Sequence, residues 1–274
     1  MTGSALRTSL TIGLGAGLAF ASLGGLARSA PGEGAGAVCS AEARPDRLQD
    51  LSPEGDLVLA SLGPALLAGV RLPDAPPYRD QALAWLRERA GEPNLVQAGE
   101  RSDRWGRKSV RIRSGGAMPS LDWSHSLVEA GLAITDAGLD DTFCQPELLA
   151  LEATARERRL GLWADDRYKP MDVNQPERLR DRIGSFILVE GRVRSIGERK
   201  QRTYLNFGGQ WAEDFTIIIP RKTWRQMSDR GMGAEALKGR WIRARGVLQP
   251  WQGTSFSILI PDMIERLEGG RLPR

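Results

Sequence analysis

Three short blocks of sequence, in a fixed order along the chain, constrain the fold more than any other feature. The first is Asp-Arg-Trp-Gly-Arg at residues 103–107, a glycine turn between two strand-like segments. The second is Leu-Val-Glu-Ala-Gly-Leu-Ala at residues 127–133, in which Gly131 ends a helical pattern. The third is Gly-Leu-Trp at residues 161–163, which follows a second helical stripe. Together the blocks predict a pair of strands followed by two helices.

These blocks resemble the staphylococcal nuclease (thermonuclease) family over roughly residues 55–166. In that family the Asp-x-aromatic-Gly-Arg turn follows the third strand of a small barrel. The arginine of that turn reaches the scissile phosphate in the family, and the resemblance implies this role for Arg107. The resemblance implies an α+β fold, mainly β, in which a five-stranded oligonucleotide/oligosaccharide-binding (OB) barrel carries three helices. We therefore expect a thermonuclease-like OB barrel over residues 51–168.

Hydrophobic periodicity supports this arrangement along the first part of the chain. Apolar runs at residues 57–60 and 66–70 flank a Gly-Pro pair, which predicts a hairpin. Apolar residues then recur at helical spacing from Arg79 until Gly91 stops the pattern. Further strands are predicted at residues 95–98 and 108–113, and further helices at about 120–130 and from Pro146.

A second β-rich segment begins after residues 170–176, where the apolar pattern breaks. Strands are predicted at residues 186–193, 203–207, 215–219, 241–247 and 255–260, with a helix at 221–227. A helix between the third and fourth strands is again typical of an OB barrel, so we expect two small OB-type five-stranded barrels. The second spans residues 185–267 after a linker at 169–184. It should be separable, because few apolar residues occupy the boundary.

The N-terminus predicts export. Arg7 precedes an apolar run over residues 10–26 and small residues up to Ala30, which is typical of a secretory signal peptide at residues 1–30. An uncleaved single-span membrane anchor is the alternative interpretation. We expect a linker at residues 31–50 to follow. The mature protein would then be periplasmic or secreted, or membrane-anchored if the segment is retained.

Cysteine content, charge and histidine content limit the compartment, the partner and the kind of metal site that the chain can have. The chain has two cysteines, Cys39 and Cys144, and in an oxidising compartment such a pair predicts a disulfide, with two unpaired thiols as the alternative. A net charge of +4 and a pI near 9.4 suit a polyanion such as nucleic acid, or an anionic membrane surface. The only histidine is His125, so the sequence excludes a histidine-cluster metal site.

The resemblance also implies candidate site residues. Phosphodiester hydrolysis in the thermonuclease family uses Ca²⁺ held by carboxylates, and arginines that neutralise the phosphate. Asp56 keeps a metal-ligand position and Arg107 keeps a phosphate arginine. In an ungapped register, Leu66 replaces the other arginine, Arg71 replaces the second metal aspartate, and Asp74 replaces the catalytic glutamate. A cation in a ligand position should severely weaken Ca²⁺ binding, so we expect a weak site at most.

A gapped register is the alternative. It places Arg71 on the phosphate and Asp74 beside Asp56 as a second metal ligand, at the cost of deleting two residues from a strand. An even shift preserves the two faces of a strand, so this register is physically allowed. In either register the catalytic set is incomplete. The paired tyrosines that the family has shortly after the block at residues 127–133 are also missing.

Basic and aromatic residues near turns are the candidate nucleic-acid contacts. Trp105 and Arg104 lie beside Arg107, where a base could stack and a second phosphate could bind. The alternative is that the tryptophan caps the end of the barrel. In the second barrel, Arg202 and Trp251 lie in or near predicted loops, and basic loops interleaved with aromatic residues are typical of single-strand binding.

These features favour an exported thermonuclease-family protein that binds DNA or RNA. Its metal-dependent phosphodiester hydrolysis is expected to be weak or lost, because the second metal carboxylate is missing. The alternative is a catalytically inactive envelope module that binds or scaffolds protein or polysaccharide. A fold supports many functions, so the residues of the site must separate the two.

Overall fold

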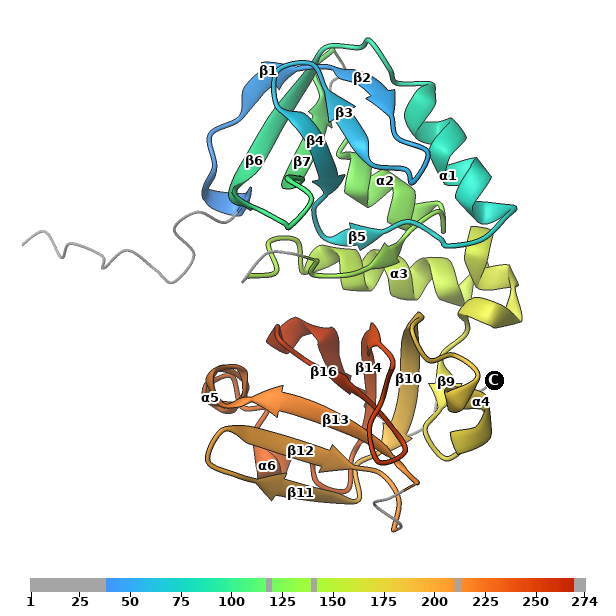
Figure 1. Ribbon diagram of the computed structural model, residues 1–274, viewed down its shortest axis with the longest axis vertical. Coiled ribbons are helices and arrows are strands. Elements are labelled where there is room, and N and C mark those ends of the chain that lie inside the picture. Colours follow the sequence, from blue (N-terminus) through green and yellow to red (C-terminus); the bar gives the residue numbers. More distant parts are fainter. Residues whose placement is uncertain (1–37, 117–119, 139–141, 210–212, 269–274) are drawn as a thin grey trace, which may run out of the picture. The chain divides into compact units, whose positions relative to one another are not determined.

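The fold is a mixture of strands and helices, arranged around one curled sheet in the N-terminal half and further sheets in the C-terminal half (Figure 1). The computed structural model describes residues 38–116, 120–138, 142–209 and 213–268. The predicted signal peptide at residues 1–30 lies outside these ranges. We use "N-terminal half" for residues 38–168 and "C-terminal half" for residues 169–268.

The curled sheet of the N-terminal half has six strands in the order β1-β6-β7-β4-β3-β2. They are β1 (Arg44–Asp46), β2 (Leu48–Leu51), β3 (Leu57–Leu59), β4 (Gly63–Leu67), β6 (Asn94–Ser102) and β7 (Lys108–Ser114). The strands β1 and β2 stand at opposite ends of this order, yet only Arg47 separates them in the chain. The sheet therefore curls until its two ends meet, and it buries Val110 and Ile112 inside.

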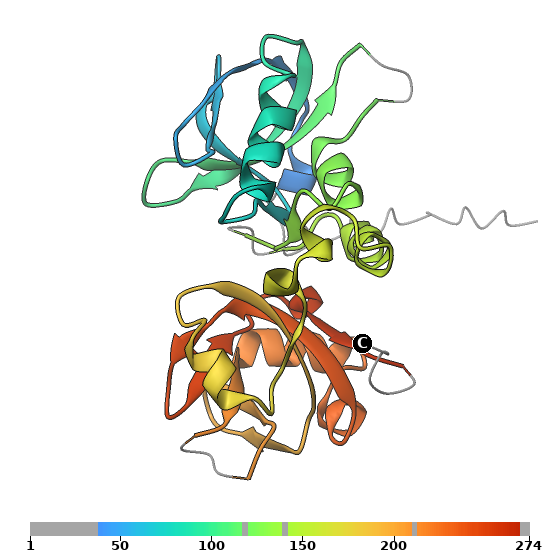
Figure 2. The same cartoon turned by 90° about the vertical axis from the view of Figure 1, so that its right-hand side faces the viewer.

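Three helices accompany this sheet, as the periodicity predicts: α1 (Tyr78–Arg87), α2 (Trp123–Glu129) and α3 (Glu147–Glu157). The helix α1 runs lengthwise beside the sheet and buries Leu83 and Leu86 in the core (Figure 2). The helix α2 starts later than predicted, because the Asp122 side chain accepts the backbone N–H of His125 and caps the first turn. Two short strands, β5 (Val70–Arg71) and β8 (Ile134–Thr135), pair with each other.

Both segments that we expected to be linkers contain regular structure. Residues 38–50 form η1 (Val38–Ser40), β1 and most of β2, and residues 169–184 contain β9 (Met171–Asp172) and α4 (Pro176–Arg180). Leu48 and Leu179 are fully buried, so each of the two segments is packed against the hydrophobic core. The strands are only two to four residues long, so they leave no periodic pattern in the sequence.

The C-terminal half contains two sheets, in the orders β17-β14-β10-β9 and β11-β12-β13-β16-β15. The elements after β9 are β10 (Phe186–Arg192), β11 (Ser195–Glu198), β12 (Arg202–Asn206), β13 (Phe215–Pro220), α5 (Arg221–Asp229), α6 (Ala234–Leu237), β14 (Trp241–Val247), β15 (Gln249–Pro250), β16 (Thr254–Ser257), η4 (Pro261–Met263) and β17 (Ile264–Arg266). The predicted helix at 221–227 is confirmed as α5. The strand β11 was not predicted.

The two halves share a pairing pattern. In each, a strand pairs in parallel with a later one, β4 with β7 and β13 with β16, and helix lies between them in the chain. In each, two successive strands near the start are separated by only one or two residues and pair with different neighbours. The separating residues are Arg47 in the N-terminal half, and Val193 and Arg194 in the C-terminal half.

The predicted disulfide is confirmed. Cys39 and Cys144 are bonded, with their Cα atoms 5.3 Å apart, and the bond closes a separation of 105 residues. It fixes η1 to the segment that enters α3. Such a bond indicates an oxidising compartment outside the cytoplasm. Within the described ranges, none of the helices has the length and apolar character needed to span a membrane.

A buried ion network joins the two halves. Arg245 on β14 is 1% exposed, and its guanidinium donates to Glu152 of α3 at 2.8 Å and to the carbonyl of Thr135 at 3.2 Å. Glu265 of β17 also pairs with Arg245. Alongside this network, Leu188 of β10 packs in one apolar cluster with Trp163 of the N-terminal half.

Candidate functional site

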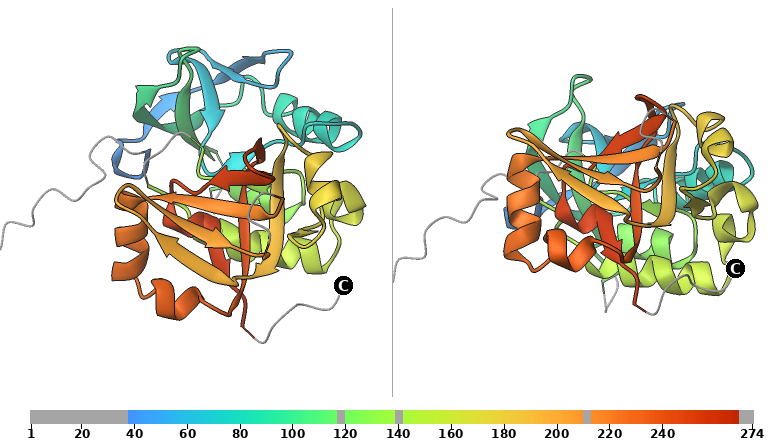
Figure 3. Two further views of the ribbon diagram at one scale, coloured as in Figure 1. Left: turned by 60° about the horizontal axis from the view of Figure 1, so that its bottom comes forward. Right: turned by 90° about the horizontal axis from the view of Figure 1, so that it is seen from below.

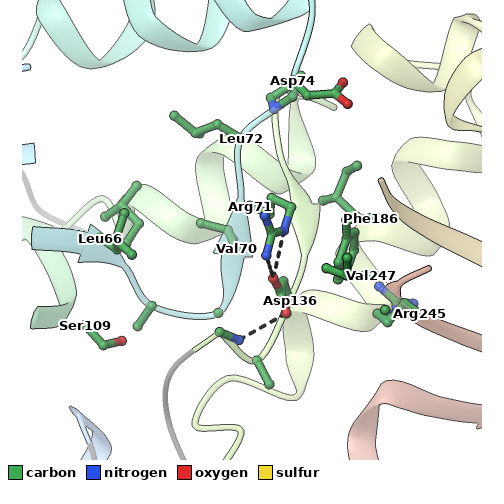
Figure 4. Close-up of a pocket in the computed structure, with 18 of the residues that line it drawn as sticks. Leu66, Val70, Arg71, Leu72, Asp74, Ser109, Asp136, Phe186, Arg245 and Val247 are labelled. Atoms are coloured by element: carbon green, nitrogen blue, oxygen red, sulfur yellow. Dashed lines mark hydrogen bonds and ion pairs between the residues drawn. The ribbon is translucent and has the colours of Figure 1, made fainter. Parts of the chain in front are cut away.

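A cavity of about 800 Å³ brings together most of the residues that the sequence singled out. Its lining includes Asp56, Arg71, Asp74, Trp105 and Arg107, along with the apolar replacement at position 66. Elements of the C-terminal half complete the wall with Phe186, Arg245, Val247 and residues 257–260. In Figure 4, Leu66 and Ser109 lie on one side, Phe186 and Val247 on the other, and Arg71 and Asp136 between them.

Arg107 is clamped between two carboxylates. Its Nη1 donates to Oδ1 of Asp56 at 2.8 Å, while its Nε and Nη2 donate to Oδ2 of Asp103 at 2.8 and 2.7 Å. Partial burial alone would lower the pKa of Arg107, but the hydrogen bond to Asp103 and the negative charge of Asp56 outweigh it and raise that pKa. The guanidinium therefore stays protonated, and its positive charge is already balanced by the two carboxylates.

The turn at residues 103–107 is organised by its first residue. Oδ1 of Asp103 accepts the backbone N–H groups of Trp105 and Arg107, each at 2.9 Å. Gly106 has a φ of +78°, a left-handed conformation that favours glycine. Partial burial alone would raise the pKa of Asp103, but its hydrogen bonds from Arg107 and Trp105 outweigh this effect and lower it. The Asp-x-Trp-Gly-Arg spacing thus allows Asp103 to hold both the backbone and the side chain of Arg107, which lines the cavity.

Trp105 is 62% exposed, so it does not cap the core of the sheet. Two guanidinium groups lie near its ring, with Cζ of Arg104 at 4.2 Å and Cζ of Arg107 at 4.7 Å from the ring centroid. Exposed aromatic rings beside cations are the type of surface on which single-stranded bases stack, and a base stacking here competes with the arginines for the ring.

Arg71 has a carboxylate partner that local sequence does not reveal. Its Nε and Nη2 each lie 2.9 Å from Oδ2 of Asp136, and its Cζ lies 4.8 Å from the centroid of the Phe186 ring (Figure 4). The pairing of β5 with β8 brings Arg71 next to Ile134, two residues before Asp136. Asp136 and Phe186 are site residues that the sequence reasoning missed, because they are 65 and 115 residues away.

Asp74 also has a hydrogen-bond partner within the protein. Oδ1 of Asp74 accepts a hydrogen bond from the Tyr168 hydroxyl at 3.1 Å. Burial of the phenol, together with the negative charge of Asp74, raises the pKa of Tyr168 to about 12. Tyr168 stays neutral over the physiological range and remains a donor to Asp74. No motif in the sequence pointed to this tyrosine.

The residues present do not fit a Ca²⁺ ion. Calcium takes six to eight oxygen ligands, which usually include several carboxylates. Here Asp56 is bound by Arg107, Asp74 by Tyr168, and position 71 is itself a cation. Nowhere in the described ranges do three acidic, cysteine or histidine side chains gather as a metal would require.

Two predicted contacts lie away from the cavity and from each other. Arg202 pairs in register with Pro220 at one end of β13, whereas Trp251 precedes Thr254, which pairs with Phe215 at the other end. Trp251 is 43% exposed. The two side chains therefore lie toward opposite ends of β13.

Comparison with protein families assigns part of the chain. The family described as staphylococcal nuclease homologue matches residues 65–165. The matched range contains all three sequence blocks, Arg71, Asp74 and Arg107, but it begins after Asp56. No curated protein matches the chain.

Proposed function

We propose, from the premise that residues 65–165 form a domain of the staphylococcal nuclease homologue family, that this protein is an exported nucleic-acid-binding protein with weak or lost hydrolysis. The family is one of nucleases, so nucleic acid is the substrate class that it implies. The observation that carries the proposal is the turn at residues 103–107. It holds Arg107 in the cavity and presents the exposed ring of Trp105 beside it.

Three features support weak or lost catalysis. Leu66 lines the cavity where the ungapped register expects a second phosphate arginine. Loss of one preorganised donor to a transition state typically lowers the rate by about 10²–10³-fold. Arg71 stands where that register expects a metal ligand, and Asp56 is neutralised by Arg107. The members of the family are typically Ca²⁺-dependent, and this chain lacks a fitting set of donors.

We infer further that both halves are OB-type barrels. The second spans the expected residues 185–267, and the first spans 44–168 rather than 51–168, because β1 and most of β2 precede residue 51. In an OB barrel the third and fifth strands run in parallel and a helix precedes the fourth. The parallel pairs β4 with β7 and β13 with β16 support this assignment, as do the closely spaced strand pairs β1 with β2 and β10 with β11, whose members pair with different neighbours.

The second candidate function is an inactive envelope module that binds or scaffolds protein or polysaccharide. The observation that favours it is that all four arginines lining the described cavity already have acceptors. Arg71, Arg107 and Arg245 pair with carboxylates, and Arg79 donates to backbone carbonyls, including that of Glu54 at 2.6 Å. A phosphate entering the cavity must displace one of these acceptors.

Binding and cleavage should be measured separately to test the proposal. We expect the exported protein to bind a single-stranded oligonucleotide and to degrade little or no DNA with Ca²⁺. Trp105→Ala should weaken binding by about 5- to 150-fold, since stacking of one base contributes about 1–3 kcal/mol. Leu95→Ala, another exposed apolar side chain, is the control and should leave the affinity unchanged. No binding by the wild type would favour the scaffold function.

Substitutions that restore the family residues test the register of the chain against the family motif. If the ungapped register is right, Arg71→Asp combined with Leu66→Arg should raise Ca²⁺-dependent cleavage. Strong cleavage by the wild-type protein that a chelator abolishes would contradict the proposal of weak hydrolysis. It would favour the gapped register, with Asp56 and Asp74 as joint ligands and Arg71 on the phosphate.

A further inference from the structure

One end of the C-terminal half carries a dense group of exposed cations. They lie on the loop that joins β11 to β12, at the first residue of β12 and on the first turns of α5. The group consists of Arg199, Lys200, Arg202, Arg221, Lys222 and Arg225, all of which are exposed. We call these six residues the α5 basic surface.

Strand pairing brings the two segments together. Arg202 on β12 lies opposite Pro220 at the end of β13, and the N–H of Arg221 donates to the carbonyl of Gln201 at 3.0 Å. The helix α5 therefore starts beside the loop, at one end of β12 and β13 (Figures 1 and 3). It buries Trp224 and Met227, which turns its cations toward solvent.

The charge of this surface is not neutralised locally. In the part of the chain that the structure describes, none of the six cations forms an ion pair with a carboxylate. One acidic residue, Glu198, lies within the two segments 198–202 and 221–225. The whole chain has a net charge of only +4, so the charge of these six cations exceeds the net charge of the entire protein. The cavity differs, because its arginines already have acceptors.

We propose that the α5 basic surface binds the phosphates of single-stranded nucleic acid and supplies most of the sequence-independent affinity of the protein. The proposal rests on the proposed function above and adds a second contact region to it. Thr223 of α5 donates its hydroxyl to the carbonyl of Leu259 at 2.8 Å, and Leu259 lines the cavity. The helix that carries half of the surface is therefore hydrogen-bonded to a residue of the wall of the cavity that Trp105 also lines.

An anionic membrane is the competing polyanion, and the composition of α5 disfavours it. Helices that bind membrane surfaces insert an exposed apolar face among the lipids. The large apolar side chains of α5, Trp224 and Met227, are 7% and 1% exposed. The surface therefore offers charge without an apolar face to insert.

The expected effect follows from counterion release. Each phosphate contact on a single strand contributes about −0.7 to the slope of log K against log salt, so six contacts give a slope of about −4. Removing three cations should halve the slope and lower the affinity by roughly 100-fold at ~0.1 M salt.

The experiment compares two triple variants with the same charge change. Arg202→Gln, Lys222→Gln and Arg225→Gln alter side chains of the surface that make no hydrogen bond or ion pair with the described residues. The control combines Arg47→Gln, Arg87→Gln and Arg158→Gln, which are exposed arginines of the N-terminal half. Affinity for a fluorescent single-stranded oligonucleotide is measured across a salt series, with thermal unfolding as a check on folding. We expect the lower slope and the loss of affinity in the surface variant alone.

Other outcomes have distinct meanings. Equal losses in both triple variants would reduce the effect to net charge and overturn the inference. Wild-type binding that the surface variant retains would overturn the inference and leave the proposed function standing. Absence of any oligonucleotide binding by the wild type would overturn both. If the surface variant instead loses binding only to phosphatidylglycerol vesicles, the surface is a membrane contact and the inference is wrong.

Discussion

At the scale of single residues, the site is defined by charges that are already paired. Arg107, the arginine that the sequence assigns to the phosphate, lies within 2.8 Å of carboxylate oxygens of both Asp56 and Asp103. A phosphate that approaches it must compete with Asp56, which is less tied to the turn than Asp103. The competition between carboxylate and phosphate should therefore set the affinity of this site.

Asp56→Asn is predicted to strengthen binding of a single-stranded oligonucleotide by about five- to tenfold at low salt. The change removes a repelling charge and releases Nη1 of Arg107, while Asp103 continues to hold Nε and Nη2. Fluorescence anisotropy against salt measures the effect. Glu157→Gln, an exposed site on α3 with the same charge change, should alter affinity much less. Equal gains in the two variants would show that the pairing at Arg107 does not matter.

Tyr168 should titrate late. Burial, with the nearby charge of Asp74, raises the pKa of Tyr168 to about 12, above its unfolded value of about 10. The contribution of the neutral phenol to stability is thus complete below about pH 10 and is lost as pH rises toward 12. Tyrosinate absorbance of the folded protein should show one of the three tyrosines titrating near pH 12. A Tyr168→Phe variant that keeps this late phase would contradict the assignment.

At the scale of elements, the disulfide ties the first described helical turn to the entry of α3. The residue after Cys144, Gln145, is buried and donates to the carbonyl of Ala68 at 3.2 Å, just before the strand that carries Arg71. The side chain of Gln145 therefore connects the disulfide to the segment that leads into β5.

Cys39→Ser with Cys144→Ser should lower the free energy of unfolding by about 4–5 kcal/mol, because the bond closes a separation of 105 residues in the unfolded chain. Urea unfolding of the double variant measures this loss. Reduction of the wild-type protein serves as the control and should produce a similar shift. An unchanged urea midpoint in both cases would mean that the bond does not constrain the unfolded chain.

At the scale of the whole molecule, the described residues belong to one compact unit, and a buried arginine contributes to it. Arg245 of the C-terminal half pairs with Glu152 of α3 and with Glu265, and Glu152 also accepts the backbone N–H of Thr135 at 2.7 Å. Thr135 belongs to β8, which pairs with the strand that carries Arg71. The C-terminal half thus supports the wall of the cavity.

Arg245→Met should destabilise the protein by about 3–5 kcal/mol, because it leaves the buried carboxylate of Glu152 without its partner across the interface. Calorimetry should then show the two halves unfolding at different temperatures. The matched control is Arg243→Met, since Arg243 is also buried but pairs with Glu190 inside the C-terminal half. That variant should lower stability without separating the transitions. A single transition in Arg245→Met would argue against the interface as the source of coupling.

The sequence alone determined the local features of this protein. The turn at residues 103–107, the glycine that ends α2, the helix at α5 and the cysteine pair all follow from residue types at short spacings. Their physical causes act over a few residues, through backbone conformation, capping and hydrophobic periodicity. The strands of residues 38–50 were missed for the same reason, since two short strands have too few residues to show a period.

Only the tertiary structure decided what the charged residues of the site do. Asp56 and Arg107 are 51 residues apart in the chain, Arg71 and Asp136 are 65 apart, Asp74 and Tyr168 are 94 apart, and Glu152 and Arg245 are 93 apart. The sequence supplied each charge, but the pairing of β5 with β8 and the packing of the two halves selected its partner. Whether a charged side chain can bind a ligand depends on the groups within a few ångströms of it, because Coulomb and hydrogen-bond energies fall steeply with distance.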